Sequence, residues 1–155
     1  MKTRFMFLIL AVLLASAQLC VAADDPSLGT WKLDEAKSKL AEGAPKNSTV
    51  VYEAAGDSIK ITIDGVGTDG KPTHNEWTGK FDGKDYPVVG DSSSTSRSYK
   101  RINAHTLHAV NKKDGKETLS AHIVISADGK SRTVTTTSTD VSGKKVTGTA
   151  VYNKQ

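Results

Sequence analysis

Cysteine is almost absent from this chain: Cys20 is the single one among 155 residues. It lies in an N-terminal segment that we expect to be removed, so the remaining protein would contain no disulfide. Small exported domains often depend on disulfides because their cores are small. The roughly 130 residues that remain are enough to bury a core without such bridges.

Long apolar runs are also missing beyond the first residues. Met1 to Arg4 is short and basic, Phe5 to Leu14 is apolar, and small residues follow up to Ala23. This order is typical of a signal peptide, and the apolar run is shorter than a membrane-spanning helix needs. We therefore predict a cleaved signal peptide over residues 1–23 and a single β-barrel domain over residues 24–155. The alternative is a retained membrane anchor. The protein is predicted to be secreted or periplasmic, with no stable membrane insertion after cleavage.

An excess of charge of one sign is likewise absent. The sequence has 21 basic and 17 acidic side chains, and removing Lys2 and Arg4 with the leader leaves 19 against 17. The lysines are scattered, mostly at turns, and form no basic stripe of the kind that nucleic acid requires. Nucleic acid is therefore not a predicted partner.

What the chain does have is a series of short β-strands separated by turn signals. Asp-Gly-Lys begins at Asp69, Asp82, Asp114 and Asp128, and Asp-Gly suits a type I′ hairpin turn. A brief helix over Glu35 to Ala41, capped by Asp34, is the only helix expected. The predicted strands are Gly29–Leu33, Ser48–Ala54, Ser58–Asp64, Thr73–Phe81, Lys84–Val89, Thr95–Ile102, His105–Lys112, Lys116–Ser126, Ser131–Thr139 and Lys144–Asn153. The fold class is all-β: an antiparallel up-and-down meander of about ten strands that closes into a calycin-like barrel, because closure removes exposed strand edges.

The alternation of side chains along these strands predicts the lining of the barrel. One half is expected to be apolar and the other mixed, with Arg97, Tyr99, His108, Arg132 and Thr136 as candidates for the interior. A mixed lining suits a cavity that holds water or a polar-headed ligand. If Ile63 and Trp77 both face inward, a regular hairpin through Asp69-Gly70 has the wrong parity, so we predict a bulge at Gly65 to Gly67. A two-residue turn at Asn103-Ala104 would place His108 inside the barrel with Arg97.

Catalytic and metal-binding signatures are missing. No serine lies in Gly-x-Ser-x-Gly, and we predict that the protein is not an enzyme. His105 and His108 are three residues apart on a strand, which directs them to opposite faces. In the predicted register His108 and His122 also lie on opposite faces, so no metal and no cofactor are expected.

Two terminal motifs carry a family resemblance. Gly29-Thr30-Trp31-Lys32-Leu33 resembles the Gly-x-Trp first strand of lipocalins and the opening strand of fatty-acid-binding proteins, and Thr149 to Lys154 resembles the last strand of the latter. The chain is similar to the lipocalin-like (calycin) proteins that bacteria export, and more distantly to fatty-acid-binding proteins. The carboxylate clamp of the latter uses Arg-x-Tyr on the last strand. Here the matching positions are Ala150 and Tyr152, so the arginine is missing.

The resemblance implies a binding protein for a small hydrophobic or amphipathic ligand held in the barrel interior, and we expect a monomer. The predicted ligand-binding residues are Ile61, Trp77, Phe81, Arg97, Tyr99 and His108, with Gly29 and Trp31 in structural roles. A buried Arg97 would require an anionic ligand, ordered water or an acidic partner. The alternative is an interaction, inhibitor or structural module of the cell envelope with a packed interior, whose surface includes the loop Asp91 to Ser94.

Overall fold

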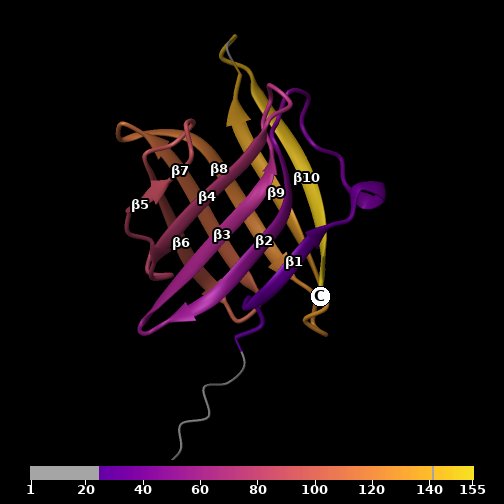
Figure 1. Ribbon diagram of the computed structural model, residues 1–155, viewed down its shortest axis with the longest axis vertical. Helices are drawn as coiled ribbons and strands as arrows, with labels where there is room; N and C mark the ends of the chain where they lie inside the picture. The colour runs from indigo at the N-terminus through magenta and orange to yellow at the C-terminus, as the bar shows by residue number, and fades with distance from the viewer. Residues whose placement is uncertain (1–24, 141) are drawn as a thin grey trace, which may run out of the picture.

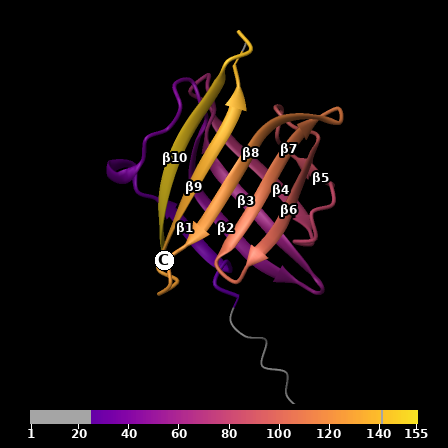
Figure 2. The ribbon, with the colours of Figure 1, turned by 180° about the vertical axis from the view of Figure 1, so that it is seen from behind.

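The computed structural model describes residues 25–140 and 142–155, so the predicted signal peptide lies outside the described residues. The chain forms one closed antiparallel barrel in which each strand pairs with its neighbours in sequence, and β1 pairs with β10 to close it (Figures 1 and 2). The strands are β1 (Gly29–Leu33), β2 (Lys46–Ala55), β3 (Ser58–Val66), β4 (Pro72–Gly79), β5 (Tyr86–Val89), β6 (Ser96–Asn103), β7 (Thr106–Lys113), β8 (Lys116–Ile125), β9 (Ser131–Thr139) and β10 (Lys145–Lys154). The predicted fold class and strand order are confirmed. No helix among the described residues is long and apolar enough to cross a membrane.

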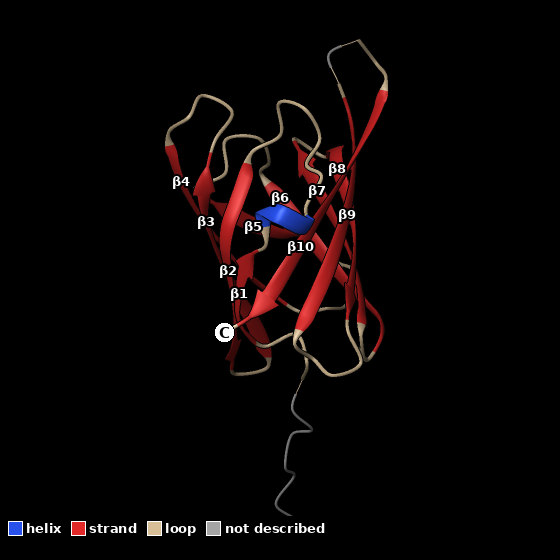
Figure 3. Cartoon of the chain, turned by 90° about the vertical axis from the view of Figure 1, so that its right-hand side faces the viewer, coloured by secondary structure: helices blue, strands red, loops and turns tan. Residues whose placement is uncertain are grey.

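The predicted helix is present only as the 3-10 helix η1 (Glu35–Lys37), drawn in blue in Figure 3. Asp34 caps it as expected, and its side chain accepts a hydrogen bond from the Lys37 N–H. The predicted extension to Ala41 is wrong because the next residues pair with β10 instead. Lys39 and Thr149 exchange two backbone hydrogen bonds of 2.7 Å, so tertiary pairing prevails over local helix propensity.

The Asp-Gly-Lys turns are of two kinds. Asp114 (φ 51°) and Gly115 (φ 80°) both have positive φ and form the predicted type I′ turn between β7 and β8. In the other three, the carboxylates of Asp69, Asp82 and Asp128 accept the backbone N–H two residues later. These are Asx turns within longer loops, and the type I′ prediction is wrong for them.

The predicted bulge at Gly65 to Gly67 is also wrong. The β3–β4 ladder is regular from Ile59 to Val66, and both Ile63 and Trp77 face the interior as expected. The connection between the strands is a five-residue loop from Gly67 to Lys71, whose length absorbs the parity mismatch. The bulge prediction depends on a two-residue turn at Asp69-Gly70, and the longer β3–β4 loop removes the need for a bulge.

Two bulges beside β7 change which of its side chains face inward. Ile102 is the extra residue where β6 pairs with β7, and Thr118 is the extra residue where β8 pairs with β7. Leu107 and Ala109 therefore fill the interior, whereas His108 lies on the outer face. The interior placement of His108 was wrong, since burying Leu107 completely is more favourable than burying an imidazole.

One end of the barrel is sealed by the residues before β1. Trp31 is completely buried, and its Nε1 donates a hydrogen bond of 2.9 Å to the Ser27 carbonyl oxygen. Arg101 forms an ion pair with Asp25, and Lys154 Nζ donates to the carbonyl oxygen of Pro26 at 3.2 Å. Trp31 therefore occupies the closed end, where β10 returns to meet β1.

Gly29 has a conformational reason to be glycine. Its φ is +110°, and an added Cβ would lie 2.9 Å from Lys154 Cε. The positive φ disfavours any side chain at this position, whereas the approaching end of the Lys154 side chain could move aside. The predicted structural placement of Gly29 and Trp31 agrees with this geometry.

Candidate functional site

Aromatic rings fill the half of the interior that β2 to β6 enclose. The rings of Trp77 and Tyr99 are 4.7 Å apart between centroids, and those of Phe81 and Tyr99 are 5.7 Å apart. Tyr86 packs edge-on against Trp77 at 5.8 Å. Trp77 Nε1 donates to the Arg97 carbonyl oxygen at 2.8 Å, which fixes the indole in the wall. These rings form a rigid apolar surface along one side of the barrel.

Arg97 faces inward, as predicted, and its charge is balanced within the chain. It is 4% exposed, and its Nη2 lies 3.0 Å from Asp91 Oδ2. Nη1 donates to Asn75 Oδ1 at 3.4 Å. Of the three ways to compensate a buried Arg97, the chain uses an acidic partner. Arg97 is therefore part of the scaffold near the mouth.

The loop from Gly90 to Thr95 is held in place by Asp91. Ser93 and Ser94 donate to its carboxylate through N–H and O–H groups at 2.5 to 2.8 Å. Burial raises the pKa of Asp91, but the hydrogen bonds from Ser93 and Ser94 and the charge of Arg97 outweigh it, so the pKa falls below 3.8. This carboxylate is ionised at neutral pH and anchors the loop that the alternative hypothesis placed at its surface.

Arg132 on β9 is the second buried arginine, and it has no such partner. It is 3% exposed, and no carboxylate of residues 25–140 or 142–155 lies within 4.0 Å of its nitrogens. Its guanidinium lies 4.8 Å from the ring centroids of Trp31, Tyr52 and Tyr152. Its Nε has no hydrogen-bond acceptor among the described residues.

Two tyrosines of this cluster are held neutral. Burial raises the pKa of Tyr52 far above its ordinary value; neighbouring Tyr99 raises it further, while Arg132 opposes the shift. Burial also raises the pKa of Tyr152, whose hydroxyl donates to the Asn47 carbonyl oxygen at 3.1 Å. The positive charge of Arg132 is therefore not neutralised by a tyrosinate.

The opposite half of the interior, formed by β7 to β10, is lined by aliphatic side chains such as Leu107, Ile123 and Ile125 together with small ones. Ala109, Ala121 and Ala150 are buried and share this wall with Gly148. The segment before β2 passes close to Gly148, where an added Cβ would lie 2.6 Å from the Ala41 backbone nitrogen.

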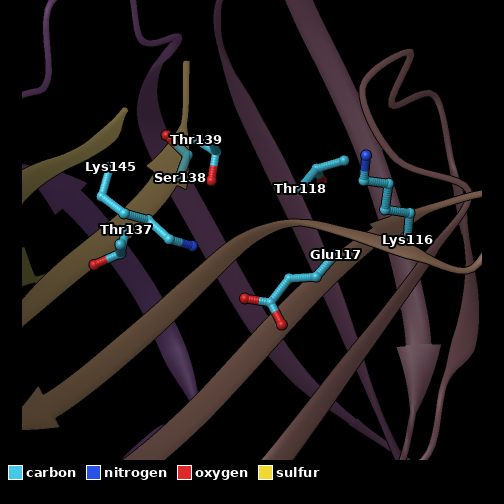
Figure 4. A pocket seen from close by; sticks show the side chains of 7 residues that line it. All are labelled: Lys116, Glu117, Thr118, Thr137, Ser138, Thr139 and Lys145. Carbon is cyan, nitrogen blue, oxygen red and sulfur yellow. The ribbon is translucent and has the colours of Figure 1, made fainter. Parts of the chain in front are cut away.

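A cleft of about 350 Å³ opens at the mouth rim, where β8 and β9 separate (Figure 4). The β8–β9 ladder ends at the pair Leu119 and Ser138, and β9 and β10 extend beyond it (Figure 3). The cleft is lined by residues with polar or charged side chains: Lys116, Glu117, Thr118, Thr137, Ser138, Thr139 and Lys145. It lies apart from Arg132, which is near the opposite end of β9.

The structure brings together five of the six predicted ligand-binding residues. Ile61, Trp77, Phe81, Arg97 and Tyr99 face the interior, and His108 does not. The sequence indicated an inward Arg132 but gave it no role, and the register of Tyr152 could not be assigned from the ambiguous Ser142-Gly143 turn. Tyr152 and Arg132 are direct cross-strand partners, and this pairing brings the tyrosine ring to the Arg132 guanidinium.

Comparison with protein-family models finds no match, and neither does comparison with curated protein sequences. Among solved structures, the chain is similar to lobster apocrustacyanin A1, with 14% sequence identity and a TM-score of 0.41. The match covers 86% of this chain and 63% of the crustacyanin chain. The assignment to a lipocalin-like, calycin architecture rests on the closed ten-stranded up-and-down barrel itself.

Proposed function

We propose that this protein is an exported carrier or sensor that binds a small amphipathic ligand inside the barrel, with an anionic head group held by Arg132. The observation that carries the proposal is a buried guanidinium without a carboxylate partner among the described residues. The signal-peptide pattern of residues 1–23 supports export.

The energetics of Arg132 favour an anionic ligand. Removing a guanidinium from water costs several kcal/mol. Cation–π contacts with three rings offset part of this, at about 0.5–1 kcal/mol each when exposed and about 2 kcal/mol or more when desolvated, but they supply no negative charge. The Arg132 Nε has no acceptor among the described residues, which is also true of Arg97 Nε, so the missing carboxylate partner is what distinguishes Arg132. A carboxylate, sulfonate or phosphate would supply both the charge and the acceptors, and arginine binds such groups in a bidentate manner.

The position of Arg132 also agrees with the resemblance to fatty-acid-binding proteins. Their clamp has an arginine two residues before the last-strand tyrosine, where this chain has Ala150. Arg132 lies directly opposite Tyr152 on the adjacent strand. The arginine and the tyrosine hence meet through strand pairing, with the Arg132 guanidinium 4.8 Å from the Tyr152 ring centroid.

Binding to Arg132 is tested with two fluorescent probes that share one aromatic skeleton. Anilinonaphthalene sulfonate is anionic, and N-phenyl-naphthylamine is its neutral counterpart. We expect the anionic probe to bind more tightly by about tenfold to a hundredfold, as hydrogen bonds to charged groups are worth about 1.5–3 kcal/mol. In Arg132→Met this preference should disappear while the neutral probe still binds.

A matched control separates Arg132 from the other buried arginine. The double variant R97M/D91N removes a guanidinium together with its own carboxylate, so the preference for the anionic probe should persist. Circular dichroism of each variant confirms that it is folded. Equal affinity for both probes in the unchanged protein contradicts the assignment of Arg132 to an anionic head group.

The alternative function, an envelope interaction module, has one observation in its favour. Six ring pairs among Tyr52, Trp77, Phe81, Tyr86 and Tyr99 lie within 6.4 Å between centroids. Such packing leaves less space for a ligand tail. If neither probe binds and native mass spectrometry of the untagged protein from its own host finds no bound molecule, the interior is filled and this alternative is favoured.

A further inference from the structure

The two bulges beside β7 place a pair of histidines together on the outer surface of the barrel. His108 on β7 and His122 on β8 are direct cross-strand partners in an antiparallel ladder, with Ala109 and Ala121 as the next pair inside. His122 is exposed and His108 is half-buried. Both strands lie side by side in the wall that faces the viewer in Figure 2. The expectation that these imidazoles lie on opposite faces was wrong.

The spacing of such a pair suits chelation. Directly opposite residues in an antiparallel ladder have Cβ atoms about 4.5–5.5 Å apart. Imidazole nitrogens bind zinc at about 2.0–2.1 Å, and the length of the histidine side chain lets two rings from adjacent strands reach one ion. No described residue forms a hydrogen bond or ion pair with either imidazole, so both remain available.

The surroundings define the kind of metal. The cross-strand neighbours of the pair are Lys100 beside His108 and Thr135 beside His122, and neither is acidic. Without carboxylates, the hard cations Mg²⁺ and Ca²⁺ are disfavoured, whereas Cu²⁺, Ni²⁺ and Zn²⁺ accept imidazole readily. No group of three or more metal-ligating side chains occurs among the described residues, so water completes the coordination.

We propose that His108 and His122 form a two-imidazole surface site for divalent transition-metal ions of the Cu²⁺, Ni²⁺ and Zn²⁺ class. The site is separate from the barrel interior and does not depend on the ligand proposed there. The affinity should be highest for Cu²⁺ and lower for Ni²⁺ and Zn²⁺. Two protein ligands impose little geometry, so the intrinsic preference of nitrogen ligands decides the order. Lys100 opposes binding through its like charge.

The experiment uses protein expressed from the full-length sequence without a polyhistidine tag. Isothermal titration with Cu²⁺ should give one ion per chain, and electron paramagnetic resonance should show two coordinated imidazole nitrogens. Either His108→Gln or His122→Gln should weaken binding about tenfold or more, since each removes the chelating partner of the other. Lys100→Gln should tighten it.

His74→Gln and His105→Gln are the matched controls. His74 Nδ1 lies 2.7 Å from Asp64, and His105 is on the turn before β7, so both variants should retain the affinity of the unchanged protein. His122 is exposed, and its substitution is informative even if His108→Gln perturbs folding. Affinity that is insensitive to His122→Gln, or that is lost in His74→Gln, overturns the proposal.

Discussion

The replacement of Trp31 by alanine tests the assignment of the closed end. Truncating a large buried aromatic side chain typically costs about 3–5 kcal/mol. Trp31 is completely buried, its loss leaves the Ser27 carbonyl without its donor, and it removes one of three rings around Arg132. An orphaned carbonyl adds about 1 kcal/mol. We therefore expect a loss near the upper limit, about 4–5 kcal/mol of unfolding free energy.

Urea denaturation followed by tryptophan fluorescence of Trp77 and by circular dichroism measures this loss. With an m-value of about 2 kcal/mol/M, the midpoint should fall by roughly 2 M. Trp31→Phe is the matched control: it keeps most of the ring but removes the Nε1 donor, so it should cost about 1–3 kcal/mol. A loss below about 1.5 kcal/mol for Trp31→Ala would refute the view that this side chain seals the barrel.

The ion pair at the mouth gives two further predictions. Asp91→Asn leaves Arg97 buried without its counter-charge and should cost about 3–5 kcal/mol, whereas the double variant R97M/D91N should recover most of this loss in urea denaturation. The second concerns acid. Because the folded pKa of Asp91 lies below 3.8, its contribution is fully present above that pH and is lost as the pH falls through the folded value. Acid denaturation curves should therefore decline less steeply below pH 4 in the double variant, and equal slopes contradict the role of Asp91.

Strand order and closure were predictable because they depend on local signals. Alternating apolar residues in the β2–β3 hairpin and repeated Gly-containing turns define short antiparallel neighbours, and Gly-x-Trp marks the first strand. Val50 pairs with Ile63 and Tyr52 with Ile61, and all four side chains lie on the buried face, as the alternation indicates. These features require no knowledge of distant contacts.

The faces of β7 were not predictable in the same way. Its register depends on two extra residues, Ile102 and Thr118. Neither of them is a glycine, the residue type that would indicate a bulge in the sequence. A register with Leu107 facing the interior and a register with His108 facing the interior both fit the alternation of side chains along β7. Only the complete barrel shows that Leu107 has a buried place to occupy, and the histidine pair on the outer surface follows from that choice.

The two buried arginines show what sequence could and could not reveal about the site. Arg97 and its partner Asp91 are six residues apart, but their contact depends on a loop whose hydrogen bonds through Ser93 and Ser94 turn the carboxylate inward. The ring cluster around Arg132 depends on the pairing of β9 with β10, which places Arg132 beside Tyr152. Both positions were identified as inward-facing from alternation alone, whereas their charge balance was not.

That difference in charge balance distinguishes the scaffold arginine, Arg97, from Arg132, which we propose binds a ligand. Arg97 is buried with its own carboxylate, so its charge is compensated within the chain, whereas aromatic rings supply no counter-charge. Arg132 lies deeper, among rings that orient it but cannot neutralise it. If Arg132 served stability alone, Arg132→Met would lower the free energy of unfolding. If it is retained for a ligand, the substitution should raise it, since an apolar side chain of similar length fills the same space without the desolvation penalty. We expect that gain in stability together with a loss of anionic-probe binding, the combination that marks a residue retained for a ligand at a cost to the fold.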